Sequence, residues 1–181
     1  MNLVPRYLFF TKGVGHDPEM LRSFENALEN AGIAKFNLVP VSSIVPPGCR
    51  IIPRERGLAM LQDGQIVFVV LSKCSSNERR RLLSASIGCA LPADKGMYGY
   101  ISEHHAFGQT AEEAGEYAEN LAASMLASTL GLPFDLDKSW DERKQIWKIS
   151  GKIVRTTNVT QTAFVKEGMW TTVLAAAVFV L

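Results

Sequence analysis

The sequence has few cysteines, almost no net charge and no long hydrophobic run, and each shortage excludes a class of protein. Its three cysteines, Cys49, Cys74 and Cys89, form an odd set without CxxC spacing, which argues against a disulfide scaffold or a thiolate zinc site and favours a reducing cytoplasm. Lys and Arg number 19 against 18 Asp and Glu, giving a net charge of +1, so we expect no nucleic-acid partner. The longest charge-free apolar stretch, residues 168–181, is short for a bilayer span, so we expect no membrane partner. The N-terminus has no basic segment followed by an unbroken apolar core, so we expect no secretory signal.

Common catalytic and binding motifs are also missing. The sequence contains no GxSxG, GxxxxGK[ST] or HExxH. Gly13 and Gly15 form only a fragment of a glycine-rich loop, so we expect no bound nucleotide. His104 and His105 are adjacent, and neighbouring strand residues point to opposite faces, so the pair cannot chelate one ion and we expect no metal. The charged run 78–81 is interpreted as a solvated surface.

What is present suits one compact domain covering residues 1–181. Asp17 and Pro18 predict a helix start, and Thr110 followed by Glu113 predicts a capping box at the start of a long helix. Apolar runs predict strands at residues 6–11, 34–41, 65–71, 82–91, 97–102, 146–155 and 170–181. Pro40 predicts that the second of these strands lies at a sheet edge or ends there.

This pattern of about two helices and six or seven mostly antiparallel strands predicts an α+β fold. We expect a layered sandwich of mostly antiparallel sheets with flanking helices, of the αββα type. Two helices alone cannot cover both faces of so many strands. We therefore expect subunits to associate and bury the remaining apolar surface.

The pair Ser42-Ser43 is the most informative polar feature. Two serines in a loop usually only cap or turn the chain. Here they follow an apolar strand containing Asn37 and precede Ile-Val-Pro-Pro-Gly, which forces a fixed, non-helical path. A serine held where its hydroxyl can attack its own preceding carbonyl meets the requirement for an N→O acyl shift.

The stretch NALENAGIAKFNLVPVSSIVPPG resembles the self-cleavage region of pyruvoyl-dependent arginine decarboxylases. In that family an Asn-Leu-containing strand runs into Ser-Ser-(Ile/Val)-X-Pro. The segments FFTKGVG and IGCALPADKGMYGYISEHHAFG and the alanine-rich final strand follow in the family's order. The resemblance therefore covers nearly the whole chain.

The resemblance implies that the chain cuts itself between Ser42 and Ser43. The products would be residues 1–42 and residues 43–181, the latter blocked by a pyruvoyl group derived from Ser43. Asn37 matches the family's Asn before the cleavage site, and its amide would polarise the scissile carbonyl or hold the oxyanion. Read alone, Asn37 is a hydrogen-bonded polar group at a strand end.

The resemblance also implies the reaction. The pyruvoyl cofactor would form a Schiff base with L-arginine and accept electrons as CO₂ leaves, giving agmatine. Glu103 matches the family's proton donor to the α-carbon, which requires a buried carboxyl with a raised pKa. His104 is the alternative acid.

Substrate recognition is where the sequence departs from the family. Glu25 stands where the family usually places Asp against the guanidinium, and it is one methylene longer. Read alone, Glu25 is equally well an exposed helix residue. The resemblance adds Leu28 and Ser42 to the substrate pocket, and it implies a homotrimer, or a dimer of trimers, with the site between subunits.

Two alternatives stay open at the level of sequence. Pyruvoyl-dependent histidine decarboxylases also cut at Ser-Ser and share the mechanism, so the substrate could be another amino acid. A chain that is never cut would instead be a non-catalytic assembly or binding subunit.

Overall fold

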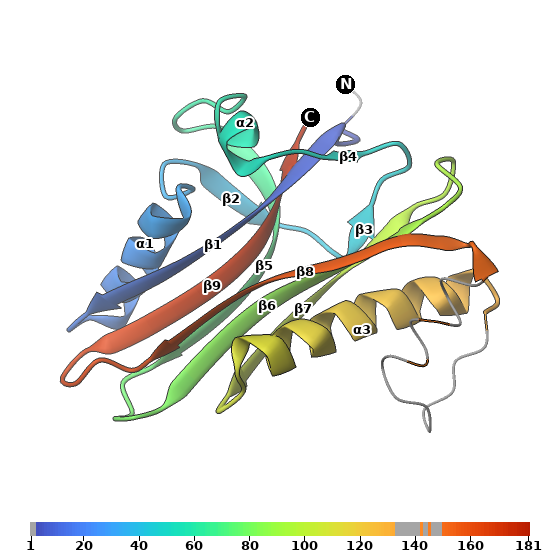
Figure 1. The fold of residues 1–181 in the computed structure, drawn as a ribbon. Helices are drawn as coiled ribbons and strands as arrows, with labels where there is room; N and C mark the ends of the chain where they lie inside the picture. Colours follow the sequence, from blue (N-terminus) through green and yellow to red (C-terminus); the bar gives the residue numbers. More distant parts are fainter. Residues whose placement is uncertain (1–2, 133–141, 143–144, 146–149) are drawn as a thin grey trace.

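The structure, a computed structural model, describes residues 3–132, 142, 145 and 150–181. Two sheets stack on one another, and helices flank the stack (Figure 1). The first sheet has the strand order β2-β5-β9-β1-β4 and consists of β1 (Tyr7–Asp17), β2 (Asn37–Pro40), β4 (Arg50–Ile51), β5 (Ile66–Ser76) and β9 (Trp170–Val180). The second has the order β3-β7-β6-β8 and consists of β3 (Ile44–Val45), β6 (Leu82–Pro92), β7 (Gly99–Phe107) and β8 (Ile153–Phe164).

Helices cover both outer faces of this stack. Helix α1 (Met20–Ala31) packs on β1 and β9, and the short α2 (Arg54–Leu58) also contacts β1. Helix α3 (Ala111–Thr129) lies along β6, β7 and β8 on the other side (Figure 1). The layers therefore run helix, sheet, sheet, helix, which confirms the predicted α+β sandwich.

Alternation along the strands divides the core into layers. Leu8, Val70, Ile87 and Ile101 belong to the cluster between the sheets. A second cluster joins α1 to the outer face of the first sheet, and a third joins α3 to the second sheet. The final strand β9 lies at the centre of the first sheet, and each of its residues from Thr171 to Val180 is buried.

Several predicted element boundaries are confirmed. Pro40 ends β2, which is an edge strand pairing only with β5 in the described chain. Thr110 and Glu113 form the predicted capping box: the Thr110 hydroxyl accepts from the Glu113 N–H at 3.2 Å, and the Glu113 carboxylate accepts from the Thr110 N–H at 2.8 Å. The Thr110 N–H first, and then the Thr110 hydroxyl, stabilise the charged carboxylate and hold the pKa of Glu113 below its ordinary value.

Other boundaries differ from prediction. Helix α1 begins at Met20 rather than after Asp17, because the Asp17 carboxylate accepts the N–H of Glu19, the extended residue that precedes the helix. The last-but-one strand begins at Ile153, so the predicted strand is wrong at residues 150–152, and the earlier part of that prediction, residues 146–149, lies outside the described part.

Gly13 and Gly15 do not form a loop. Both lie within β1, which continues to Asp17 instead of ending at residue 11. A Cβ on Gly13 would overlap the carbonyl oxygen of Ala27, and one on Gly15 would overlap that of Ser23, both in α1. The two glycines allow the helix to approach the strand closely, which explains them without a nucleotide.

The apolar surface is not where we predicted it. Helices cover both outer faces, and one group of exposed apolar side chains lies at the β2 and β3 edges. Val39, Val41 and Ile44 are more than a third exposed there, and Ile66 at the start of β5 is 60% exposed. In the described part of the chain, no helix combines the length and the apolar character needed to cross a bilayer.

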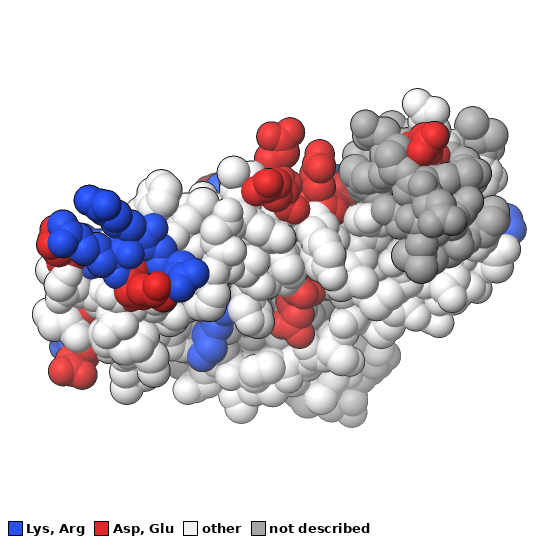
Figure 2. Space-filling model, turned by 90° about the horizontal axis from the view of Figure 1, so that it is seen from below, with Lys and Arg blue, Asp and Glu red and all other residues white. Residues whose placement is uncertain are grey.

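Positive charge gathers at one end of the molecule (Figure 2). Arg79, Arg80 and Arg81 in the turn between β5 and β6 lie near the turn between β8 and β9. The Arg81 guanidinium pairs with Glu78, and that of Arg79 lies 3.2 Å from the Glu167 carboxylate. These exposed local pairs match the predicted solvated charge run.

Candidate active site

The segment Val41–Ser43 connects the edges of the two sheets. At one end the Val41 N–H donates to the Val69 carbonyl at 2.9 Å, which continues the β2–β5 pairing. At the other end the Ile101 N–H donates to the Ser43 carbonyl at 2.7 Å, next to β3. The exposed Ser42 carries the chain from one sheet to the other, as the passage from β2 to β3 in Figure 1 shows. The segment is thus fixed at both ends, with Ser42 exposed and Ser43 half-buried.

The pairing of β3 with β7 places Ser43. Ile44 lies opposite Tyr100 and Val45 opposite Gly99, so the same register puts Ser43 opposite Ile101. Val45 is buried between the sheets, and Ser43, two residues earlier, points to the same side. The Ser43 hydroxyl makes no hydrogen bond within the described chain, so it is available as a nucleophile.

The register also brings Glu103 close to Ser43. Glu103 follows Ile101 by two positions in β7, so both side chains point to the same side of the sheet. Ser43 and Glu103 are therefore diagonal neighbours, a relationship that places side chains about 7–8 Å apart. That separation leaves room for the α-carbon of a substrate between them.

Glu103 is exposed, so the prediction that its carboxyl is buried is wrong for the single chain. The reason is the length of β3, which has only two residues. Beyond Ile101, the edge of β7 has no neighbouring strand in the described chain. Within the described residues, no strand covers this side of Glu103.

The two histidines point in opposite directions, as strand alternation predicted. His104 faces α3, where its ring lies 4.3 Å from that of Tyr117 and its Nε2 lies 2.8 Å from the Gln109 side-chain oxygen. It is therefore on the far side of the sheet from Ser43 and is poorly placed as the alternative acid. His105 shares the side of Ser43 and Glu103, which we overlooked although the same alternation gives it.

Asn37 is not near the scissile bond in the single chain. It starts β2, and its side-chain amide donates to the Gly64 carbonyl at 2.7 Å. Ser42 lies five residues further along extended chain, about 16 Å away at about 3.3 Å per residue. Within one chain Asn37 is the hydrogen-bonded strand-end group and does not reach the Ser42 carbonyl.

Glu25 and Leu28 also lie away from Ser43. Glu25 is exposed on α1 and lines an open hollow of about 500 Å³ together with Glu29, Gly32, Ala34 and Lys35. The Lys35 ammonium lies 2.6 Å from the Asp63 carboxylate, so its charge is directed to that partner. Leu28 is only 7% exposed and packs in the core beneath α1, which contradicts its predicted place in a substrate pocket of this chain.

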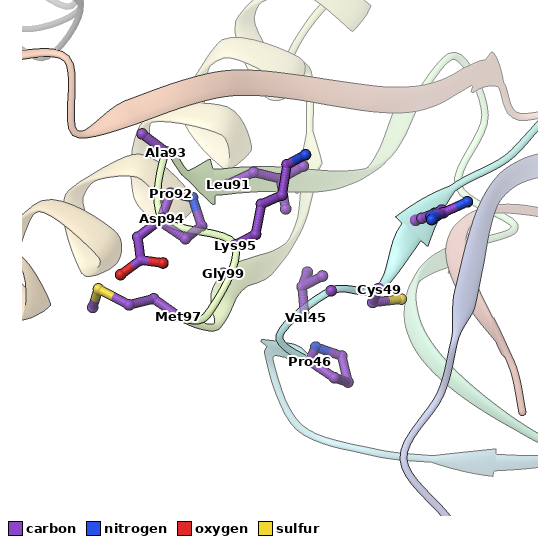
Figure 3. A pocket seen from close by; sticks show the side chains of 12 residues that line it. Val45, Pro46, Cys49, Leu91, Pro92, Ala93, Asp94, Lys95, Met97 and Gly99 are labelled. Carbon is purple, nitrogen blue, oxygen red and sulfur yellow. The ribbon is translucent and has the colours of Figure 1, made fainter.

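A second pocket, of about 410 Å³, lies beside Val45, between the loop leading to β4 and the hairpin joining β6 to β7 (Figure 3). Neither Ser43 nor Glu103 lines it. Burial raises the pKa of the Cys49 thiol in its wall to about 11, so that thiol stays protonated near neutral pH. All three cysteines are free.

Comparison with known proteins gives a consistent result. Residues 7–181 match the pyruvoyl-dependent arginine decarboxylase family. A probable pyruvoyl-dependent arginine decarboxylase of Chloroherpeton thalassium is 59% identical over 179 residues, covering 98% of each chain. One of Chlorobaculum tepidum is 58% identical over 178 residues with the same coverage. A pyruvoyl-dependent arginine decarboxylase of Nitrosopumilus maritimus is 54% identical over an alignment of 182 positions that covers 100% of each chain.

Proposed function

Because the chain belongs to the pyruvoyl-dependent arginine decarboxylase family, we propose that it cuts itself between Ser42 and Ser43 and then decarboxylates L-arginine to agmatine and CO₂. One observation of the structure carries the proposal. Ser42 is exposed and Ser43 half-buried, hydrogen bonds fix the segment at both ends, and Glu103 is a diagonal neighbour of Ser43. The fixed peptide serves self-cleavage, and the neighbouring Glu103 serves as the acid in decarboxylation.

Self-cleavage needs only the chain's own atoms and water. The Ser43 Oγ attacks the Ser42 carbonyl carbon, the Ser42 C–N bond breaks, and the nitrogen takes the hydroxyl proton, leaving an ester. Loss of the Ser43 α-proton to water and rupture of the Cβ–Oγ bond then release the Ser42 carboxylate and leave dehydroalanine. Water replaces the nitrogen as ammonia, giving the pyruvoyl group at position 43.

The residues around position 43 fit that group. Ser43 is the only part of the segment consumed, and its carbonyl is already held by Ile101. When present, the group supplies a keto carbon for the substrate amine and an electron sink for the pair released with CO₂. Glu103 then holds the proton that the α-carbon must receive.

The small fragment should remain in place after the cut. It contains β1, whose 11 residues pair with β9 inside the first sheet, and also α1 and β2. In addition, the Arg54 guanidinium donates to the Ala31 carbonyl at 3.0 Å, joining the fragments at the end of α1. Cleavage thus removes one link between the sheets and keeps the layers.

We assign Glu25 and Asn37 to the site of a neighbouring subunit. Both belong to the 1–42 fragment, and neither reaches position 43 of its own chain. The exposed apolar side chains at the β2 and β3 edges support a subunit contact there. A trimer, alone or paired into a hexamer, would place the carboxylate of Glu25 opposite Ser43 and cover Glu103.

A denaturing gel and a CO₂ assay test the proposal together. Purified protein should give fragments of roughly 4.6 and 15 kDa, from a chain of 19.9 kDa, with the larger blocked to N-terminal sequencing. Offered arginine and histidine separately, it should release CO₂ from arginine. An uncut chain that releases no CO₂ from either would refute the enzyme, and release from histidine alone would refute the substrate.

A further inference from the structure

A backbone hydrogen bond joins the Ile101 N–H to the carbonyl of the reactive Ser43. Its N···O distance is 2.7 Å, at the short end for a backbone pair. It extends the β3–β7 pairing by one residue, and the register positions Ile44 and Val45 support it. Ser43 and Ile101 both belong to the 43–181 fragment, so self-cleavage does not separate donor from acceptor.

Both reactions of position 43 place negative charge next to this carbonyl. In the elimination the Cα–H bond of residue 43 breaks, and its electron pair passes into the new Cα–Cβ double bond. During that transfer, charge spreads onto the carbonyl oxygen attached to Cα. In decarboxylation, the same oxygen is conjugated with the keto carbon that receives the released pair.

We propose that the Ile101 backbone N–H is a shared oxyanion donor, which stabilises the developing charge on the residue-43 carbonyl oxygen in self-cleavage and in decarboxylation. The proposal for decarboxylation rests on the function proposed above, whereas the proposal for self-cleavage requires only the cut at Ser43. The N–H is in position before the chain is cut, so no reorganisation is required when charge develops.

The surroundings strengthen this bond. Ile101 is fully buried, and Val45, Ile87 and Cys89 in the same cluster are almost completely buried. An apolar neighbourhood lowers the local dielectric constant, so a donor there stabilises charge more than it would in water. The burial also fixes the strand from which the N–H points.

The test replaces the Ile101 amide with an ester, by incorporating the α-hydroxy analogue of isoleucine during cell-free translation of the full chain. This change removes the N–H and retains the side chain. Without any substrate, the time course of self-cleavage on a denaturing gel should slow about tenfold or more. The ester at Ser43 should accumulate, and hydroxylamine should cut it into residues 1–42 and 43–181, a pattern distinct from cutting at the introduced ester before residue 101. Cleavage at the normal rate would overturn the proposal for self-cleavage.

A matched control isolates the hydrogen bond. The same ester at Ile87 in β6 removes one ladder hydrogen bond without touching Ser43. This variant should cleave within about twofold of the parent. If the Ile87 ester slows cleavage as much as the Ile101 ester does, the effect is general weakening of the sheet and the proposal fails.

The cleaved enzyme provides the second readout. Ester-containing protein that has been cut should react about tenfold more slowly with phenylhydrazine, which condenses with the keto group, and should lose kcat for arginine in proportion. Unchanged hydrazone formation and unchanged kcat would overturn the decarboxylation half. Slower hydrazone formation in a protein that never releases CO₂ from arginine would refute the proposed function and leave this assignment standing.

A measurement on unaltered protein decides the matter if the ester variant does not fold. Labelled with ¹⁵N at Ile101 and ¹³C at the residue-43 carbonyl, the cleaved protein should show coupling between these nuclei through the hydrogen bond. Absence of that coupling in the cleaved enzyme would mean that the donor has moved away and would overturn the assignment.

Discussion

The two carboxylates assigned to the reaction lie in contrasting parts of the molecule. Glu103 is in β7, in register with the segment that is cut, and strand geometry alone makes it a diagonal neighbour of Ser43. Glu25 is on α1, which covers the outer face of the first sheet, and it lines a hollow that contains neither Ser43 nor Glu103. Glu103 thus lies beside the reactive Ser43 of its own chain, and Glu25 does not.

In the proposed site, the groups that react and the group that recognises arginine therefore come from different subunits. One chain carries the nucleophile, the scissile bond and the acid, on β7 and the segment before β3, whereas the proposed site takes Asn37 from a neighbouring subunit. In the proposed site the guanidinium partner, Glu25, comes from a second copy, for which the exposed apolar side chains at the β2 and β3 edges offer a contact. Arginine turnover should therefore depend on assembly more than self-cleavage chemistry does.

The largest expected effect concerns the cut itself. Ser43→Ala removes the nucleophile and should abolish cleavage, leaving one intact chain on a denaturing gel and no CO₂ from arginine. Ser42→Ala is the matched control, because Ser42 contributes a carbonyl that alanine also has, and it should still give two fragments. Cutting of the Ser43→Ala chain at the same bond would contradict the mechanism.

The next effect concerns protonation. Glu103→Gln should cleave normally but reduce kcat about a hundredfold, because glutamine has no acidic proton to give. His104→Gln should retain a near-normal kcat, since His104 points toward Tyr117 on the other side of the sheet. A normal kcat in Glu103→Gln together with a loss in His104→Gln would exchange the two roles.

The elements could be predicted from sequence where the signal is local. Thr110 and Glu113 are three residues apart and form the predicted cap, and Pro40 lies on an edge strand because it has no N–H to give to a neighbour. Gly13 and Gly15 were misjudged as a loop because their reason lies in α1, whose backbone approaches β1 too closely for a side chain. A single sequence does not show which helix crosses which strand.

The candidate site also combines features that the sequence could predict with features that appear only in the fold. The closeness of Ser43 and Glu103 follows from a strand register that no local pattern encodes, so family resemblance was needed to pair them. The exposure of Glu103 follows from a β3 of only two residues, which the sequence run Ile-Val-Pro-Pro does not reveal. Asn37 and Glu25 could be assigned by resemblance, but their distance from Ser43 appears only in the fold.

An intermediate effect concerns recognition. Glu25→Gln should raise KM for arginine about tenfold and leave both kcat and cleavage nearly unchanged, because it removes the charge opposite the guanidinium and nothing at Ser43. Steady-state kinetics on fully cleaved protein measures this. Unchanged KM would mean that the guanidinium partner lies elsewhere and would remove the basis of the comparison between the two carboxylates.

Mixed assemblies decide whether the two carboxylates act across an interface. Glu25→Gln and Glu103→Gln chains, each impaired alone, are co-expressed in equal amounts, so that uncut chains assemble before self-cleavage separates residues 1–42 from residues 43–181. If each site takes Glu25 from one subunit and Glu103 from its neighbour, about a quarter of the sites become fully native, and activity at low arginine concentration rises to about that fraction of the parent's. If both residues come from one chain, mixing restores no activity.

The smallest effect concerns Glu29, one turn after Glu25 in the same hollow. Neither carboxylate has an ion-pair partner in the described chain, and Lys35 is engaged by Asp63, so the charge of Glu29 adds to the attraction for a cation without a defined contact. An exposed charge acting in this way contributes about 0.2–1 kcal/mol. Glu29→Gln should therefore raise KM for arginine only about twofold to threefold, and the difference should disappear in about 1 M salt because screening shortens the range of the charge.

Glu116→Gln on the exposed side of α3 is the control and should leave KM unchanged. A tenfold rise that persists in salt would mean that Glu29 contacts the guanidinium directly, and recognition would then involve both carboxylates of the hollow.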